Sequence, residues 1–194
     1  MNVTLDTNCL IDIEEDRENA IYLRQLIRWH RDKIKLRVVG ISASERQPNG
    51  RISKTFKEFK QKLKNIGLED IEVLKPMGYI SICYLDWAII SNEKMQNDEL
   101  SIHNILFPDI EFRYKDYCLK KQINPLETKI NWKWLNAKCD VQVLWSHIHY
   151  GGGILVTSDN NFHKESKKPL LISLGVDGIL TPKDALKKIS GLYK

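Results

Sequence analysis

The sequence lacks paired cysteines, long apolar runs and internal repeats. Its four cysteines, Cys9, Cys83, Cys118 and Cys139, lie far apart without a CxxC pair, so we expect reduced thiols rather than a disulfide framework or a zinc site. The most apolar run, "YISICYLDWAII", is too short to span a bilayer and contains Asp86. The first residues, "MNVTLDTNCLID", show no positively charged segment followed by an apolar one. We therefore expect a cytoplasmic protein that is neither exported nor inserted in a membrane.

What is present is an ordinary globular composition with a modest excess of positive charge. Hydrophobic residues make up 42% of the 194 residues and charged residues 28%, so the chain is too apolar to be disordered. The length favours a single domain. The net charge of +5 permits an anionic partner without requiring one. Association of identical copies is equally compatible with this composition.

Strand and helix patterns alternate along the chain. Short apolar runs predict strands at 2–6, 35–42, 71–76, 153–159 and 176–182. Apolar residues at helical spacing predict helices at 14–33 and 52–66, a long helix that ends at the glycines 151–153, and a last helix with Thr181 as its N-cap. Residues 77–131 are expected to form helices joined by loops. This alternation favours a mostly parallel sheet covered by helices on both faces, an α/β/α sandwich.

Three acids occupy positions where a ligand is expected. Asp6 and Asp159 each follow a predicted strand, and ligands of such sheets collect at the carboxyl ends of the strands. Asp140 shares a helix face with the apolar residues Val143 and Leu144. Taken singly, the first two suit a helix cap or turn, and Asp140 suits the surface or an ion pair with a nearby lysine. Taken together, converging carboxylates require a cation between them, and their oxygen atoms suit Mg²⁺ or Mn²⁺.

The successive segments "VTLDTNCLID", "VVGISASE", "KCDVQVLW", "GILVTSDNNF" and "VDGILTP" resemble the motifs of PIN-domain nucleases, in that order. The resemblance covers roughly residues 1–47 and 132–190. It assigns the four metal-binding, catalytic acids to Asp6, Glu45, Asp140 and Asp159. It assigns roles in orienting ligands or water to the neighbouring polar residues Asn8, Thr157, Ser158 and Asn161, and a packing role to Phe162. Acids on the first predicted turn, Asp12, Glu14 and Glu15, are alternatives to Glu45.

Two features of the chain depart from the family pattern. Many members carry an aspartate where this chain has Asn161, so one acidic position is neutral here. The stretch between Glu45 and Asp140 is also longer than in compact members. We therefore expect one PIN-like domain over residues 1–194, with a largely helical insertion at about 48–130.

The resemblance implies a Mg²⁺- or Mn²⁺-dependent endoribonuclease that hydrolyses RNA phosphodiester bonds and leaves 5′-phosphate and 3′-hydroxyl ends. Many small members of the family are toxins of toxin–antitoxin pairs, so an antitoxin protein is a possible partner. The alternative is a non-catalytic PIN-like module that binds RNA or protein. A haloacid-dehalogenase-like phosphatase is disfavoured, because it requires a second aspartate where this chain has Asn8.

Basic residues on two predicted helices are the candidates for holding RNA around an acidic site. They form an arginine ridge on the first helix and a lysine-rich face on the second: Arg24, Arg28, Arg31, Lys54, Lys57, Lys60 and Lys64. Solvated helix faces explain each of them singly just as well. Trp29, Trp132, Trp134 and Trp145 are able to stack on bases, although tryptophan at helical spacing more often belongs to a core. His147 follows Asp140 by two turns and is more often a packing residue.

Overall fold

The computed structural model describes residues 1–43, 55–80, 82–83, 87–125 and 129–193, and its centre is a five-stranded parallel sheet. The strands are β1 (Asn2–Leu5), β2 (Lys35–Val39), β3 (Glu72–Leu74), β4 (Ile154–Val156) and β5 (Gly178–Leu180). They lie in the order β3-β2-β1-β4-β5, and each neighbouring pair is parallel. The first strand is therefore central, and its carboxyl end lies between the ends of β2 and β4.

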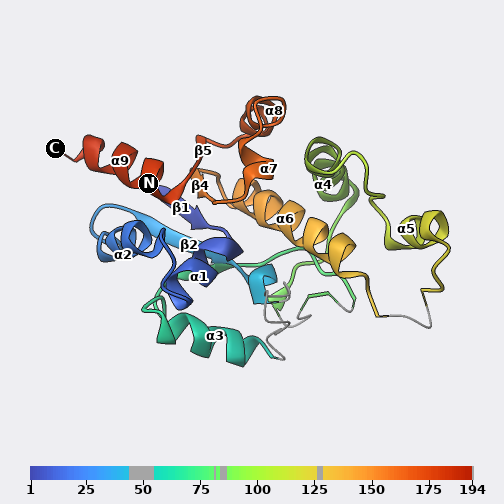
Figure 1. Cartoon of the computed structure of the whole chain (residues 1–194), viewed down its shortest axis with the longest axis horizontal. Helices are drawn as coiled ribbons and strands as arrows, with labels where there is room; N and C mark the ends of the chain where they lie inside the picture. The colour runs from blue at the N-terminus through green and yellow to red at the C-terminus, as the bar shows by residue number, and fades with distance from the viewer. Residues whose placement is uncertain (44–54, 81, 84–86, 126–128, 194) are drawn as a thin grey trace.

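Helices cover both faces of this sheet (Figure 1). Alternate strand residues, such as Val3 and Leu5 of β1, face a core shared with α1 (Thr7–Glu14), α2 (Ala20–Arg28), α3 (Phe56–Asn65) and α9 (Pro182–Leu192). The opposite face, including Leu155 of β4, packs against α4 (Glu93–Leu106), α6 (Trp132–His149), α7 (Asn160–His163) and α8 (Lys168–Ser173). The predicted α/β/α sandwich is confirmed, because strands buried on both faces need a helical layer on each side.

The first helical region differs from the single helix predicted at 14–33. Helix α1 begins at Thr7, directly after β1, because the Asp6 carboxylate accepts a hydrogen bond from the Thr7 backbone N–H at 2.7 Å. It ends at Glu14, and Asp16 then adopts a left-handed conformation with φ of 53°. Helix α2 starts only at Ala20. The sequence prediction missed the helix that starts at the candidate acid itself.

The region 48–130 contains a strand as well as helices. β3 pairs in parallel with β2 and forms one edge of the central sheet. Helices α3, α4 and α5 (Tyr114–Lys121) also come from this region. Helix α4 packs along α6 and contacts α8, and Figure 1 shows α5 at the far end of α6 from the sheet. The predicted metal-binding acid Glu45 and the predicted RNA-binding residue Lys54 lie outside the described part of the chain.

Helix α6 is fixed at its carboxyl end by a glycine turn and a buried arginine. Gly151, Gly152 and Gly153 all have positive φ, and a side chain at Gly153 would collide with the backbone oxygen of Asn2. The guanidinium of Arg37, on β2, donates to the carbonyl oxygens of Tyr150 at 2.8 Å and Gly152 at 2.5 Å. A cation at this position complements the negative end of the helix dipole.

All four cysteines are free thiols, and three of them are buried. Within the ranges given above, none of the helices is both long and apolar enough to cross a membrane.

Candidate active site

The candidate site is built around Asp6, at the carboxyl end of the central strand. Asp6 is 2% exposed. Three groups donate hydrogen bonds to its carboxylate: the backbone N–H of Thr7 at 2.7 Å, the amide of Asn8 at 2.7 Å and the hydroxyl of Thr157 at 2.6 Å. All three donors are electrically neutral. They hold the carboxylate in one orientation without supplying a positive charge.

Thr157 and Asn8 join the ends of β1 and β4. The backbone N–H of Asp6 bonds to the carbonyl of Val156 at 3.0 Å, which continues the pairing of the two strands. Asn8 donates to the Thr157 hydroxyl at 2.9 Å and accepts from the Ser158 backbone N–H at 3.1 Å. Thr157 in turn accepts from the backbone N–H of Asp159 at 3.0 Å. A continuous chain of hydrogen bonds therefore runs from Asp6 to the turn that carries Asp159.

Asp159 is half-buried and caps α7 by accepting from the backbone N–H of Asn161 at 2.8 Å. It lies close enough to Asp6 for their charges to repel. Burial, followed by this repulsion from Asp159, raises the pKa of Asp6 to about 6, although the hydrogen bonds from Thr157, Thr7 and Asn8 act in the opposite direction. Two carboxyl groups thus converge at one point of the sheet edge, and one of them is held in an environment that disfavours its charge.

Ser158 faces a third acid, Asp12, on α1. Asp12 is 5% exposed, and its carboxylate accepts from Asn19 at 2.9 Å and from the Ser158 hydroxyl at 3.4 Å. Arg17 approaches the other carboxylate oxygen of Asp12 at 3.7 Å. This network fastens the link between α1 and α2 to the end of β4. Of the three alternatives to Glu45, only Asp12 contacts the β4 turn; the other two, Glu14 and Glu15, form ion pairs with Lys62 and Arg17 respectively.

Asn161 holds Asp159 through its backbone, while its side chain points to a different element. The amide donates to the carbonyl of Leu106, at the end of α4, at 3.1 Å, and its oxygen accepts from Lys167 at 2.7 Å. Lys167 also donates to Leu106 at 2.6 Å. An aspartate at position 161 has no N–H to offer to Leu106. The amide of Asn161 is therefore suited to its contact with Leu106, which belongs to the long region between Glu45 and Asp140.

The other two predicted acids are Glu45 and Asp140. The Thr7 hydroxyl donates to the Ser42 hydroxyl at 2.8 Å, and Ser42 belongs to the 3-10 helix η1 (Gly40–Ala43) that follows β2. Glu45 comes shortly after η1 and lies outside the described residues. Asp140 is half-buried on α6, which packs against η1. The hydrogen bonds that join Asp6 to the Asp159 turn do not involve Asp140.

The donor set fits a divalent cation in its chemistry. Within the described part of the chain, no ion pair includes Asp6 or Asp159, and no group of three or more His, Cys, Asp or Glu side chains is arranged to hold a metal. The two converging carboxylates offer oxygen ligands, which are those that Mg²⁺ and Mn²⁺ prefer. A buried carboxylate with neutral donors and a repelling neighbour gains more from a bound cation than a solvated one does.

The predicted RNA-binding residues are spread over two edges of the sheet. Arg31 pairs with Asp70 at 3.1 Å and Lys64 with Glu69 at 3.2 Å, both just ahead of β3. That is the amino edge of the parallel sheet, about 16 Å from the acids if β2 rises 3.3 Å per residue. Charges at this distance from the acids are unsuited to gripping the same phosphate.

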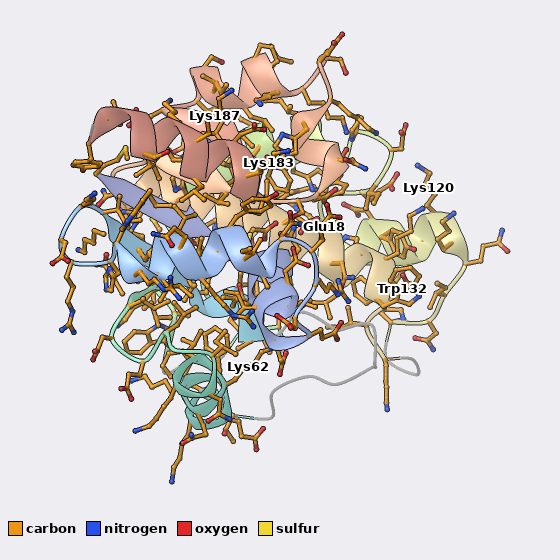
Figure 2. All side chains as sticks on the ribbon, turned by 60° about the vertical axis from the view of Figure 1, so that its left-hand side comes forward. Glu18, Lys62, Lys120, Trp132, Lys183 and Lys187 are labelled. Carbon is orange, nitrogen blue, oxygen red and sulfur yellow. The ribbon has the colours of Figure 1, made fainter. Side chains whose placement is uncertain are left out.

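The other predicted RNA-binding residues differ in the groups that they contact. Arg24 pairs with Asp16 at 2.5 Å, and Arg28 lies 3.5 Å from the side-chain oxygen of Gln25. Lys57 is exposed, and Lys60 lies over the rings of Phe56 and Trp87. Both lysines belong to α3, where Figure 2 labels their neighbour Lys62. Lys167, whose ammonium interacts electrostatically with Asp159, was not among the predicted residues.

Most of the predicted stacking residues are packed inside the protein. Trp134 and Trp145 are buried and Trp29 is half-buried. Trp132, at the start of α6 and labelled in Figure 2, is 58% exposed. His147 is fully buried, and its Nδ1 lies 2.8 Å from the Thr4 hydroxyl. Burial, and then the charge of Arg37, lowers the pKa of His147 to about 4. His147 is thus a neutral core residue of the sheet's other face.

Comparison with known proteins gives one structural similarity. The chain matches no protein-family model and no curated protein. Among solved structures it resembles the crystal structure of VapBC2 from Rickettsia felis bound to a DNA fragment from their promoter. The sequence identity is 15%, the TM-score is 0.43, and the match covers 93% of this chain and 98% of the other. At this identity and TM-score, the similarity does not extend to function.

Proposed function

We propose that the protein is a metal-dependent ribonuclease that cuts RNA internally, with Mg²⁺ or Mn²⁺ as its cofactor. The supporting observation is the convergence of Asp6 and Asp159 at the ends of neighbouring strands, with Asp6 buried among neutral donors and its pKa raised to about 6. The order of the sequence motifs supports the assignment of Glu45 and Asp140 to the same centre.

Each residue of the network has a separate task in this proposal. Asp6 and Asp159 supply oxygen ligands from two strand ends. Thr157 and Asn8 hold Asp6 in position, because each donates to the same carboxylate oxygen. A divalent ion bound here would supply an activated water and stabilise the leaving oxygen. Lys167 and the exposed Lys57 and Lys60 are positive groups available to an approaching phosphodiester backbone.

The decisive experiment incubates purified protein with labelled single-stranded RNA in Mg²⁺ or Mn²⁺. We expect the wild type to produce internal cuts with 5′-phosphate ends, and we expect Asp6→Asn and Asp159→Asn to lose this activity. The matched control is Asp177→Asn, the same exchange at an exposed residue just ahead of β5, on the opposite edge of the sheet. Thermal unfolding of all four proteins separates loss of chemistry from loss of fold.

A second candidate function is a non-catalytic module that binds RNA or protein. Wild-type inactivity with tight RNA binding that EDTA leaves unchanged would overturn the nuclease in favour of this module. Titration with Mn²⁺ adds an independent measurement: the wild type should bind the ion and gain thermal stability, and Asp6→Asn should do neither.

The role of a toxin with a protein antitoxin belongs to the proposal only through the resemblance of the motifs. The chemistry of such a pair can be tested directly. If the gene upstream encodes a short protein with a DNA-binding pattern, co-expression should give a stable complex in which the ribonuclease activity is suppressed. A complex that leaves activity unchanged would exclude inhibition by that partner.

A further inference from the structure

A cavity of about 440 Å³ lies on the opposite face of α6 from Asp140, between the segment after β3, the start of α5 and the first half of α6. Its walls carry aromatic rings from three separate segments: Tyr79, Phe112, Tyr114 and Trp134. Volumes of about 300 to 1,000 Å³ are typical of sites for small organic ligands. The flat walls and the size suit an aromatic ring system rather than a lone ion.

The cavity contains a fixed positive charge at its base. Lys138 is 3% exposed, and its ammonium lies 4.0 Å from the centre of the Phe112 ring and 4.4 Å from that of Tyr79. Glu99 holds this ammonium at 2.8 Å, and Gln142 holds Glu99 at 2.6 Å. An ammonium has three N–H donors, of which Glu99 accepts one. The ammonium thus makes the face of the cavity formed by Tyr79 and Phe112 electropositive.

The mouth of the cavity combines a cation with exposed apolar surface. Arg113 is exposed and belongs to no ion pair formed within the described residues. Ile80, on the same lining, is 84% exposed. A guanidinium at the rim favours a phosphate group because of its planar fork of donors. The lining thus offers rings for stacking and, at the rim, a cation for a phosphate.

We propose that this cavity binds one unpaired nucleotide of an RNA strand, with the base between the rings and the phosphate at Arg113. The choice of RNA rests on the proposed function. Lys138 and Asp140 lie on opposite faces of α6, about one helix diameter of 10 Å apart, so a strand whose phosphate reaches the acids is able to place a base some nucleotides away in the cavity. Loss of one stacked base should therefore weaken binding about five-fold or more.

The first test titrates the isotope-labelled protein with the four nucleoside 5′-monophosphates, in EDTA, by NMR. We expect saturable shifts at residues lining the cavity, including the indole N–H of Trp134, and dissociation constants at least five-fold weaker in Arg113→Ala. The matched control is Lys115→Ala, an exposed cation on the same helix that does not line the cavity. Absence of saturable shifts, or equal weakening by both variants, overturns the site.

The second test distinguishes a strand of RNA from a free nucleotide. A short single-stranded oligoribonucleotide is made with one abasic residue stepped along its length, and binding to the wild type is measured in EDTA. One position should cost at least five-fold in affinity for the wild type and much less for Arg113→Ala. If mononucleotides bind but no abasic position matters, the cavity is a free-nucleotide site and the RNA assignment is overturned. Cleavage is measured in neither test, so failure of the nuclease proposal leaves both results interpretable.

Discussion

Asp6 and Glu99 are both buried carboxylates, but the protein neutralises only one of them. Glu99 is 0% exposed and accepts from the Lys138 ammonium at 2.8 Å, from Gln142 at 2.6 Å and from the Tyr79 hydroxyl. Asp6 is 2% exposed, and its donors among the described residues are a backbone N–H, an amide and a hydroxyl. The charge of a second carboxylate, Asp159, repels it.

This difference separates a structural carboxylate, Glu99, from the one that we propose as a ligand, Asp6. A buried ion pair that is complete within the chain ties elements together, and here it joins α4 to α6. A buried carboxylate with neutral donors has its orientation fixed and its charge uncompensated, which is the condition that favours a cation from solution.

The largest expected effect is on stability, from Lys138→Met. Because Glu99 would remain buried without its partner, the free energy of unfolding should fall by about 3 to 5 kcal/mol. The measurement is denaturant unfolding followed by circular dichroism. The double variant Lys138→Met/Glu99→Gln should recover part of the loss, since glutamine carries no charge. Equal destabilisation of the single and double variants would contradict the view that an unpaired charge is the cause.

The opposite pattern is expected for Asp6→Asn, with a large effect on activity and little on stability. Loss of a metal ligand removes several kcal/mol of transition-state stabilisation, about 10²- to 10³-fold in rate at 1.36 kcal/mol per tenfold. Asparagine removes the buried charge and keeps one oxygen, which is able to cap α1 as Oδ1 does, while its amide group meets the Asn8 donor in place of Oδ2. Because these two changes act in opposite directions, metal-free thermal unfolding should occur near the wild-type temperature. A variant that unfolds at a markedly lower temperature would place Asp6 in the same structural class as Glu99.

A third prediction concerns pH and the metal-free protein. Burial raises the pKa of Asp6 from 3.8 to about 6, so between these values the native state binds more protons than the unfolded one and stability falls as pH rises. The expected loss is of order 2 to 3 kcal/mol, at 1.36 kcal/mol per pKa unit. His147, whose pKa is lowered to about 4, acts in the opposite direction between pH 4 and 6.5.

The contribution of Asp6 is obtained from the difference between the wild type and Asp6→Asn, because His147 is present in both proteins. Denaturant unfolding at several pH values from 4 to 8 should show the stability of the wild type falling relative to that of Asp6→Asn, with the change levelling off about one pH unit above the pKa of about 6. A difference independent of pH would contradict the raised pKa of Asp6.

The smallest effect is expected from Asn161→Asp, which restores an acid next to the site but removes the N–H that Leu106 accepts. We expect a loss of about 1 kcal/mol in stability and about a tenfold loss in activity through displacement of Asp159. The control is Asn160→Asp, the same exchange at the exposed preceding residue. Higher activity in Asn161→Asp would show that the amide weakens the site rather than supporting it.

The sequence was sufficient to predict the sheet and its helical layers, because apolar runs and turn residues are local signals. Helix α9 begins at Pro182 after the predicted N-cap Thr181. The first helix was predicted at 14–33, whereas α1 and α2 cover 7–14 and 20–28, because helices of eight and nine residues give little periodicity. The short helix α8 was not predicted, because six residues give too little periodicity.

The candidate site was predictable only in part. The positions of Asp6 and Asp159 follow from strand ends, and the structure brings these two together. Other contacts join residues far apart in sequence, such as Asn161 with Leu106 and Lys138 with Glu99. No spacing rule reveals such pairs, because they depend on how α4 packs against α6 and α7. The assignments of Glu45 and Asp140 remain predictions.

Helix α6 is anchored to the rest of the protein at two positions along its length. Arg37 ties its carboxyl end to β2, and the Lys138–Glu99 pair ties its first half to α4. Asp140 lies between these positions on a helix of 18 residues, about 27 Å long at 1.5 Å per residue. A helix of this length is stiff, so a displacement of one end is transmitted along it. A substitution of Arg37 that displaces the carboxyl end of α6 should therefore also tilt Asp140 relative to the strand ends.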